Sequence, residues 1–390
     1  MLADNVEHVI SYWVIYQAFH SAALAGFAVI SHWAPFLLFS VYIGAIADRN
    51  DCRKLMLISQ AGFMFASLAW AVLFMTHTLQ VWHAVLILVL HGLSGSFLAP
   101  ARQLVIYDVV GRKELQSAVR ITSTSTQLGL LFGPGVGGAL LLILGPGLGL
   151  IVNALVYLPM VWWSLVVPYT GHVREGASPE AARFSVFEAV RTFREASGNR
   201  DILIMVVLAG LTSLLVGNAY QAQMPAFASA YGGGNTQTIA YGLLLGANAA
   251  GAVLGGVLLE LAGVFRRARA AVAVLLSVAW CVSMLVFAAS HALALAVVAL
   301  FAAGVLQIAY SSMAQTLVQL EAPPERRGRY IGVFNFTSSG FRVGSGVSVG
   351  LLGSSIGVHL SLGISTGLLL AACLLLLIFV TRTSPVRATI

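Results

Sequence analysis

Three side chains that can bind and release protons lie close together at the start of the chain. Asp4, Glu7 and His8 are spaced by three and four residues, so a helix would place them on one face with Ser11. Counted back from a helix end near residue 20, both acids lie about 20 to 24 Å along the helix. If that helix crosses a membrane, acids at that depth are costly unless they face a water-filled cavity. We therefore predict proton binding at Glu7 and Asp4, with a solvated position near the cytoplasmic end as the alternative for Asp4.

Two more ionisable residues lie inside long apolar stretches. Arg342 is the only Arg or Lys away from a loop or the start of an expected helix. An unpaired cation there is costly, so it could pair with an acid of the first helix or bind an anionic substrate. Its long side chain could also reach the membrane surface instead. His91 can titrate near physiological pH, although a lone helical histidine is more often structural.

Amides and aromatic residues in the first and seventh stretches could line a substrate cavity. Equally, such amides can join helices to one another, and such aromatics can face lipid or the membrane interface. The candidates are Tyr12, Tyr16, Asn218 and Gln221.

The composition is that of an α-helical membrane protein. Of 390 residues, 59% are hydrophobic and only 9% are charged, with a mean hydropathy of +0.90. A soluble domain carries about 25% charged residues. Apolar runs of about 20 residues, enough to cross a bilayer, recur along the chain.

We expect twelve helices in two six-helix bundles, residues 1–168 and 201–390, joined by a cytoplasmic linker with an amphipathic helix, 169–200. The expected helices are 1–19, 22–46, 54–76, 80–106, 113–144, 146–168, 201–228, 237–262, 268–289, 292–318, 328–352 and 357–381. All 21 Lys and Arg lie in or near alternate connections and the C-terminus. Because basic loops stay cytoplasmic, we expect a multi-pass protein of the plasma (inner) membrane with both termini in the cytoplasm. This distribution argues against nucleic-acid binding.

The two halves carry related motifs. Gly44-x3-Asp48 before Arg53-Lys54 matches Gly256-x3-Glu260 before Arg266-Arg267, at an offset of 212. Gly129-x3-Gly133 matches Gly340-x3-Gly344 at an offset of 211. Such duplication is typical of transporters that hold substrate near the midplane between two halves. By the same offset the first helix lacks about ten residues, so either the true start lies upstream or this helix is short.

With these motifs the chain resembles the major facilitator superfamily over its whole length. The loop signature is Gly44, Asp48-Arg49 and Arg53-Lys54. The Asp48-Arg49-x-Asp51 form and Pro100-Ala101-Arg102-Gln103 look most like the branch of enterobactin and macrolide exporters. The fifth helix resembles an antiporter signature through Gly129, Gly133, Pro134, Gly137 and Gly138, but has Arg120 where that signature begins with glycine.

The resemblance implies roles for the charged loop. Asp48 would face the start of the eleventh helix and hold the cytoplasmic side closed, a contact favoured by the helix dipole. Cys52 replaces the arginine that the family uses to bind an acid of the fourth helix; Arg53 or Arg49 could substitute, with Asp108 as the partner. The alternative is a solvated loop that only sets topology. The family's pattern in the fourth helix, an arginine four residues before a glycine, places His91 at the arginine position relative to Gly95.

We therefore expect a monomeric, proton-coupled exporter of an amphipathic small molecule, drug-like or siderophore-like, that works by alternating access. No nucleophile–base pair or P-loop motif is present, so we expect no enzyme. The three cysteines and the histidines form no short metal motif, so we expect no metal and no cofactor. Two alternatives stay open: an uptake symporter or uniporter on the same fold, and a membrane sensor or scaffold that binds a ligand without moving it.

Overall fold

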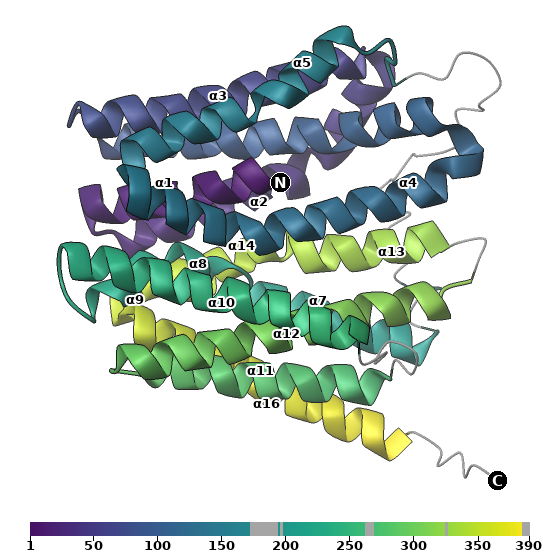
Figure 1. Cartoon of the computed structure of the whole chain (residues 1–390). Coiled ribbons are helices and arrows are strands. Elements are labelled where there is room, and N and C mark those ends of the chain that lie inside the picture. Colours follow the sequence, from purple (N-terminus) through teal and green to yellow (C-terminus); the bar gives the residue numbers. More distant parts are fainter. Residues whose placement is uncertain (172–193, 196–197, 262–268, 324–326, 384–390) are drawn as a thin grey trace. The chain divides into compact units, whose positions relative to one another are not determined.

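The computed structural model describes residues 1–171, 194–195, 198–261, 269–323 and 327–383, and within these ranges all regular structure is helical (Figure 1). The described residues form two compact units. The first holds residues 1–171 with Gln221–Ala226, and the second holds the others. Most of the expected linker, 169–200, lies outside the described residues.

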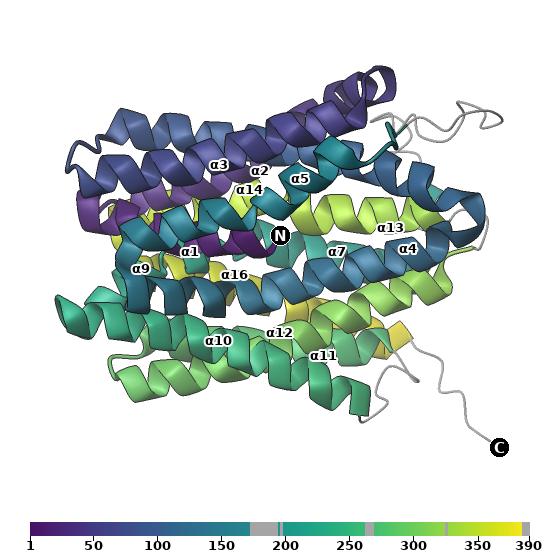
Figure 2. The same ribbon diagram turned by 45° about the horizontal axis from the view of Figure 1, so that its top comes forward.

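The longest helical element of the first unit, α4 (Val81–Val156), is divided by two breaks into three helices. The unit also contains α1 (Leu2–Phe19), α2 (Ala22–Arg49), α3 (Cys52–Met75) and α5 (Leu158–Val166). Two glycines break α4, Gly111 at φ +66° and Gly145 at φ +74°. The ribbon of α4 changes direction along its length (Figures 1 and 2). Glycine adopts such positive φ values without a steric penalty. Both breaks fall next to loops expected between helices, so α4 contains the expected helices 80–106 and 113–144 and the start of 146–168.

Short polar residues fix the starts of α2 and α3. The Ser21 hydroxyl accepts a hydrogen bond from the Leu24 N–H, and Asp51 accepts one from the Arg53 N–H. Both satisfy backbone donors that a helix start leaves unpaired. The turns between α1, α2 and α3 are therefore tight, which keeps these helices adjacent.

Glycines bring α4 close to its neighbours. A Cβ on Gly129 would lie 2.8 Å from Met1 Cβ, one on Gly133 would collide with Asn5, and one on Gly137 would lie 2.9 Å from Val9 Cβ. Because these contacts are four residues apart on both helices, α1 runs along a glycine stripe of α4. The antiporter-like glycines thus position the helix that carries Asp4 and Glu7.

The second unit contains several interrupted helices. Its elements are α7 (Arg200–Leu215), α8 (Ala219–Ala222, whose last two residues belong to the first unit), α9 (Met224–Ser229, whose first residues belong to the first unit), α10 (Asn235–Leu261), α11 (Ala270–Ala289), α12 (Leu293–Glu321), α13 (Arg327–Asn335), η3 (Phe336–Gly340), α14 (Arg342–Ser345), η4 (Gly346–Leu351), α15 (Leu352–Ile356) and α16 (Val358–Thr383). The expected helix 201–228 is broken after Leu215, near Gly217 at φ +48°. The expected helix 328–352 contains the two π-helical stretches η3 and η4.

Nine helical stretches within the described ranges are long and apolar enough to cross a membrane. Neither α1 nor the expected span 328–352 is among them. In α1 the acids and His8 lower the hydropathy, and in 328–352 the π-helical stretches divide the helix. Phe132–Val166 combines parts of two expected spans across the Gly145 break.

Candidate functional site

His91 of α4 lies between two carboxylates of α1. Its Nδ1 is 2.7 Å from Glu7 Oε1, and its Nε2 is 2.9 Å from Asp4 Oδ1. All three residues are buried, with Glu7 only 1% exposed. A neutral imidazole can donate from one nitrogen only. Two hydrogen bonds therefore need either an imidazolium or one protonated carboxyl, so the geometry fits a cluster that holds a proton.

A second layer of polar residues holds Glu7. The Ser67 hydroxyl of α3 donates to Glu7 Oε2 at 2.5 Å, and Asn153 Nδ2 of α4 donates to Ser67 Oγ at 3.1 Å. Ser67 and Asn153 are fully buried. Hydrogen bonds to a charged group contribute about 1.5–3 kcal/mol each. The chain Asn153–Ser67–Glu7–His91–Asp4 is therefore one connected network across α1, α3 and α4.

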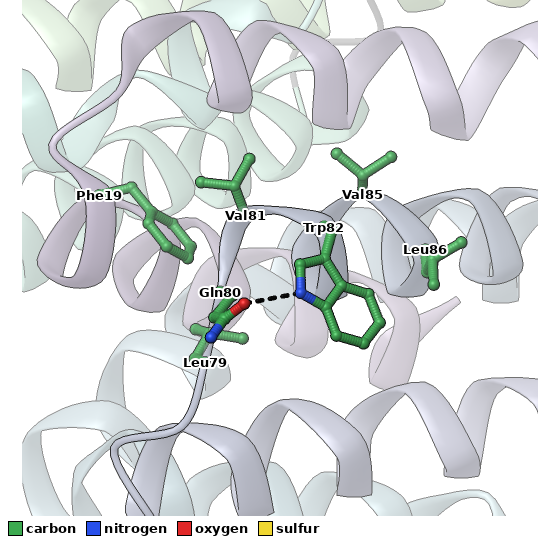
Figure 3. A pocket seen from close by; sticks show the side chains of 7 residues that line it. All are labelled: Phe19, Leu79, Gln80, Val81, Trp82, Val85 and Leu86. Carbon is green, nitrogen blue, oxygen red and sulfur yellow. Dashed lines mark hydrogen bonds between the residues drawn. The ribbon is translucent and has the colours of Figure 1, made fainter.

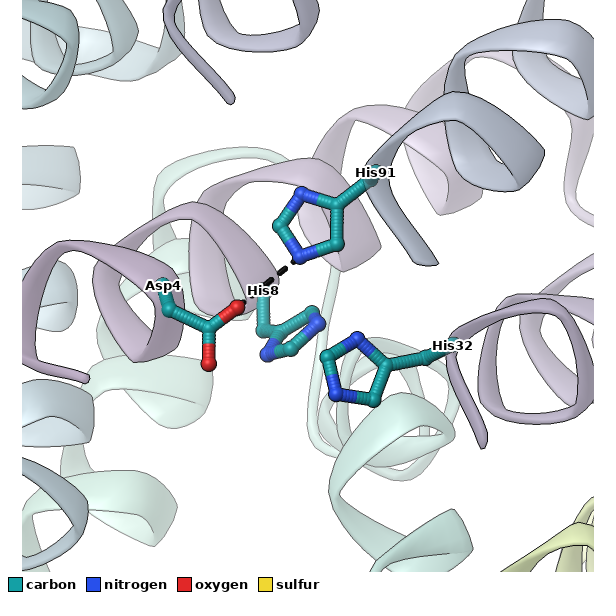
Figure 4. A group of neighbouring side chains, drawn as sticks. All are labelled: Asp4, His8, His32 and His91. Atoms are coloured by element: carbon teal, nitrogen blue, oxygen red, sulfur yellow. Dashed lines mark hydrogen bonds and ion pairs between the residues drawn. The ribbon is translucent and has the colours of Figure 1, made fainter. Parts of the chain in front are cut away.

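Two further histidines adjoin this network (Figure 4). The His8 ring centroid lies 4.9 Å from that of His91 and 4.7 Å from that of His32. One ligand atom from each of Asp4, His8, His32 and His91 can be chosen so that all four lie within 4.8 Å of one another. These side chains are of the types that bind transition metals.

Gly92 brings the α2 histidine to the cluster. A Cβ on Gly92 would collide with the carbonyl of Ser31, so only glycine lets α4 approach the α2 backbone here. His32 and His91 lie next to the two contact residues, and their ring centroids are 5.4 Å apart.

The sequence predicted Asp4, Glu7, His8 and His91 as candidates, and the structure brings all four together. His32, Ser67 and Asn153 were missed. His32 had a usable signal, since it is an ionisable residue inside the apolar stretch 22–46. Ser67 and Asn153 had none, because serine and asparagine commonly join membrane helices.

The other cavity candidates are spread over both units. Tyr12 is buried and stacks on His8 with ring centroids 5.5 Å apart, and Tyr16 is half-buried. Gln221 lies in α8 and Asn218 directly precedes this helix, and both are half-buried. Arg342 belongs to α14, between η3 and η4, and its Nε donates to the Ser338 carbonyl at 3.1 Å. Both acids of α1 already have a hydrogen-bond partner in His91, within the first unit.

The charged loop differs from expectation at Arg53. Arg53 forms an ion pair with Asp51 at 2.7 Å and donates to the Val167 carbonyl at 2.8 Å, rather than binding Asp108. Asp108 Oδ2 instead accepts a hydrogen bond from the Gly171 N–H at 3.0 Å. Side-chain hydrogen bonds from Arg53 lower the pKa of Asp51. Of the two substitutes expected to bind Asp108, Arg53 is therefore wrong, because it pairs with Asp51, which is nearer in the chain. The alternative, Arg49, stays a prediction.

The other residues of the charged loop are Gly44, Asp48, Arg49 and Lys54. Arg49 and Lys54 are exposed, Gly44 is half-buried, and the side chain of Asp48 lies outside what the structure describes. The contact expected for Asp48 stays a prediction.

Cys52 has a packing role at the family's arginine position. Its N–H donates to the Thr170 carbonyl at 2.8 Å, and a Cβ on Gly171 would lie 2.7 Å from its Sγ. The segment that leaves α5 thus occupies the space beside Cys52, where an arginine side chain would not fit. The same segment supplies the N–H that binds Asp108.

A shallow pocket of about 800 Å³ opens where α4 begins (Figure 3). Phe19, Leu79, Val81, Trp82, Val85 and Leu86 line it, together with Gln80, which accepts a hydrogen bond from the Trp82 indole at 2.7 Å. Trp82 is 56% exposed. An exposed tryptophan at the end of an apolar helix is typical of the membrane interface. None of the cluster residues lines this pocket.

A family model described as Major Facilitator Superfamily matches residues 8–344. The chain belongs to this superfamily. It is therefore a multi-pass membrane protein and a secondary transporter rather than an enzyme.

Two relatives in the superfamily resemble the chain. The uncharacterized MFS-type transporter YqjV of Bacillus subtilis is 23% identical over 355 residues, which cover 87% of this chain and 81% of YqjV. The staphyloferrin A transporter of Staphylococcus aureus is 24% identical over 132 residues, which cover 34% of this chain and 33% of that protein.

Solved structures of transporters share the fold over nearly the full length. A bacterial homolog of the human lysosomal transporter Spinster, in an inward-facing and unoccupied conformation, superposes with a TM-score of 0.69 at 16% identity and covers 98% of this chain and 96% of that one. The nucleoside transporter NupG gives a TM-score of 0.68 at 14% identity, covering 96% of this chain and 97% of that one. At these identities the likeness concerns the fold alone.

Proposed function

We propose that this superfamily member exports an amphipathic small molecule in exchange for protons, by alternating access across the plasma (inner) membrane, with both termini in the cytoplasm. Asp4, Glu7, His8 and His91 form the proton-coupling site in this proposal. The observation that carries it is the His91 ring held between two buried carboxylates, with a hydrogen bond at each ring nitrogen.

The network can bind a proton while it is buried and release that proton when it is hydrated. Two carboxylates and one imidazole buried together are more stable with a shared proton than with two uncompensated negative charges. When alternating access admits water to the cluster, hydration stabilises the ionised carboxylates and the proton can depart. Proton binding thus responds to the conformation of the transporter.

Export is the proposed direction because the glycine stripe of α4 resembles the antiporter signature. The stripe packs α4 against α1, which carries both acids. The partial likeness to a staphyloferrin A transporter supports a small-molecule substrate. Tyr12, Tyr16, Asn218, Gln221 and Arg342 are the proposed cavity residues.

Substrate-dependent proton flux tests this function. The purified protein is reconstituted in vesicles that hold a pH-sensitive dye, and amphipathic compounds are added one at a time. An antiporter moves protons in the direction opposite to the compound. A transported compound that is added outside and enters the vesicles should therefore drive protons out and raise the internal pH. Movement of compound and proton in the same direction would instead show a symporter. Absence of any movement across a broad panel would favour a sensor or scaffold.

We also propose that Asp48, with Gly44, Arg49, Arg53 and Lys54, latches the cytoplasmic side closed. Asp48→Asn removes the charge that a helix start would bind. We expect transport to fall at least tenfold while the amount of folded protein in the membrane stays unchanged. Full transport by this variant would reduce the loop to a topological signal.

A further inference from the structure

We propose that Asp4, His8, His32 and His91 form a binding site for a divalent transition metal ion of the zinc type. The proposal goes beyond proton-coupled export, because binding of the ion requires no transport. Figure 4 shows the four side chains converging from three helices, α1, α2 and α4. No short motif marks this site, because its histidines lie on three separate helices.

The distances suit a tetrahedral ion. Zinc binds imidazole nitrogens and carboxylate oxygens at about 2.0–2.2 Å, which separates neighbouring ligand atoms by about 3.4 Å. The four ligand atoms here lie within 4.8 Å of one another, and His91 Nε2 is 2.9 Å from Asp4 Oδ1. The widest pair must close by about 1.4 Å, which side-chain rotation can supply.

The charges also suit a dication. Asp4 and Glu7 contribute two negative charges in a buried cluster whose other members are histidines. One divalent ion bound to neutral imidazoles balances both carboxylates, and it would replace the proton between His91 and Asp4. Such a balance matters because uncompensated charge in a buried site is costly.

Glu7 has the geometry of an outer partner of a metal ligand. A metal-binding histidine usually donates its second ring N–H to a carboxylate, which fixes the ring and leaves the other nitrogen for the ion. Glu7 Oε1 is 2.7 Å from His91 Nδ1, so His91 Nε2 is directed at the cluster. Ser67 in turn donates to Glu7 Oε2 and fixes this acid.

The donor set selects among ions. Calcium takes six to eight oxygen ligands, and magnesium prefers an octahedron of oxygens. Three imidazoles with one carboxylate are better matched by zinc, cobalt(II), nickel or iron(II). Zinc and cobalt(II) are therefore the informative probes.

Titration of the full-length protein with metal ions tests the proposal. The protein is purified in detergent, treated with a chelator, and titrated with zinc chloride by calorimetry. Cobalt(II) is added in parallel, since a tetrahedral cobalt(II) site absorbs strongly in the visible range. We expect one zinc ion per chain and a tetrahedral cobalt spectrum. His8→Gln and His32→Gln should each weaken zinc binding at least tenfold, whereas His77→Gln, at an exposed histidine outside the cluster, should change it less than twofold.

Several results would overturn the site. These are no saturable zinc binding by folded protein, equal affinity in the two cluster variants and the wild type, or an octahedral cobalt spectrum only. If a cluster variant does not fold, the wild-type cobalt spectrum still decides, supported by the thermal shift that zinc produces. Glu7→Gln separates this proposal from the proposed function, because it removes the coupling acid but leaves all four ligands. Loss of its contact with His91 should weaken zinc binding about tenfold to a hundredfold, while the tetrahedral cobalt spectrum persists and proton-driven transport is lost. Loss of the tetrahedral spectrum in this variant would contradict the assigned ligand set.

Discussion

His91 and its two carboxylates show how one buried polar network depends on each of its members. Both ring nitrogens and both Glu7 oxygens have hydrogen-bond partners, and those partners come from α1, α3 and α4. Removing one member leaves a buried polar group unsatisfied, which costs more than the average hydrogen bond contributes. The network therefore both stabilises the first unit and holds the proposed proton-binding groups in place.

Ser67→Ala tests the outer part of this network. The change removes the hydrogen bond to Glu7 and should lower the free energy of unfolding by about 1–3 kcal/mol. Ser59→Ala is the matched control, because Ser59 is equally buried in α3 but donates only to the Leu55 carbonyl of its own helix. Thermal unfolding in detergent measures both, and equal stability losses in the two variants would contradict the proposed role of Ser67.

At the residue scale, the sequence was informative where charge is rare. Asp4, Glu7 and His8 stand out because ionisable groups in an apolar helix require a reason, and their spacing of three and four residues gives them a common face. His91 was only a weak candidate because its partners are more than 80 positions away. The prediction that Arg53 binds Asp108 was wrong because it rested on the acid that the family uses and left out Asp51, which lies only two residues from Arg53.

At the scale of elements, glycines determine how closely α1, α2 and α4 approach. Gly129, Gly133 and Gly137 meet α1, and Gly92 meets the backbone of α2. The sequence marked the glycines of α4 as an antiporter-like motif but did not identify the helix that they contact. The contact with α1 depends on tertiary packing, which the sequence of α4 alone does not specify.

Gly133→Ala should disturb this contact. The added methyl group would collide with Asn5, and overpacking of this kind costs about 1–3 kcal/mol. Gly135→Ala is the control, since Gly135 has no neighbouring atom within 4 Å of an added Cβ. We expect a lower unfolding temperature and weaker transport for Gly133→Ala only. A loss of the same size in Gly135→Ala would show that the helix tolerates no alanine here for reasons other than α1.

The stability that Asp51 contributes at the start of α3 should depend on pH. Hydrogen bonds from Arg53 lower the pKa of Asp51 in the folded protein, so the ionised form stabilises the fold above the ordinary pKa of aspartate. This stabilisation is lost as the pH falls through the lowered folded-state value. We expect Asp51→Asn to be less stable than wild type at pH 7 and the difference to shrink as the pH is lowered below about 4. Thermal unfolding at several pH values measures it; a difference independent of pH would exclude the ion pair as its cause.

At the scale of the whole molecule, each unit contains a glycine that contacts the backbone of a neighbouring helix at a related position. Gly92 meets Ser31 in the first unit, and Gly304, 212 residues later, meets the Asn248 carbonyl in the second. The spacing agrees with the offset that the sequence motifs gave. Periodic apolar stretches predicted most helices, because length and hydropathy are enough for that. The π-helical stretches and the break after Leu215 were not predictable, since they depend on packing rather than on local hydropathy.

The central claim is that the cluster of Asp4, Glu7, His8 and His91 couples substrate movement to protons. Glu7→Gln removes one proton-binding group but keeps the shape of the site. Reconstituted protein is therefore compared in two assays, exchange of labelled for unlabelled substrate without a gradient, and uphill transport driven by a pH gradient. Glu321→Gln, the same change at an exposed position at the end of α12, is the control. We predict that Glu7→Gln retains exchange and loses uphill transport while Glu321→Gln retains both; full uphill transport by Glu7→Gln would contradict the account.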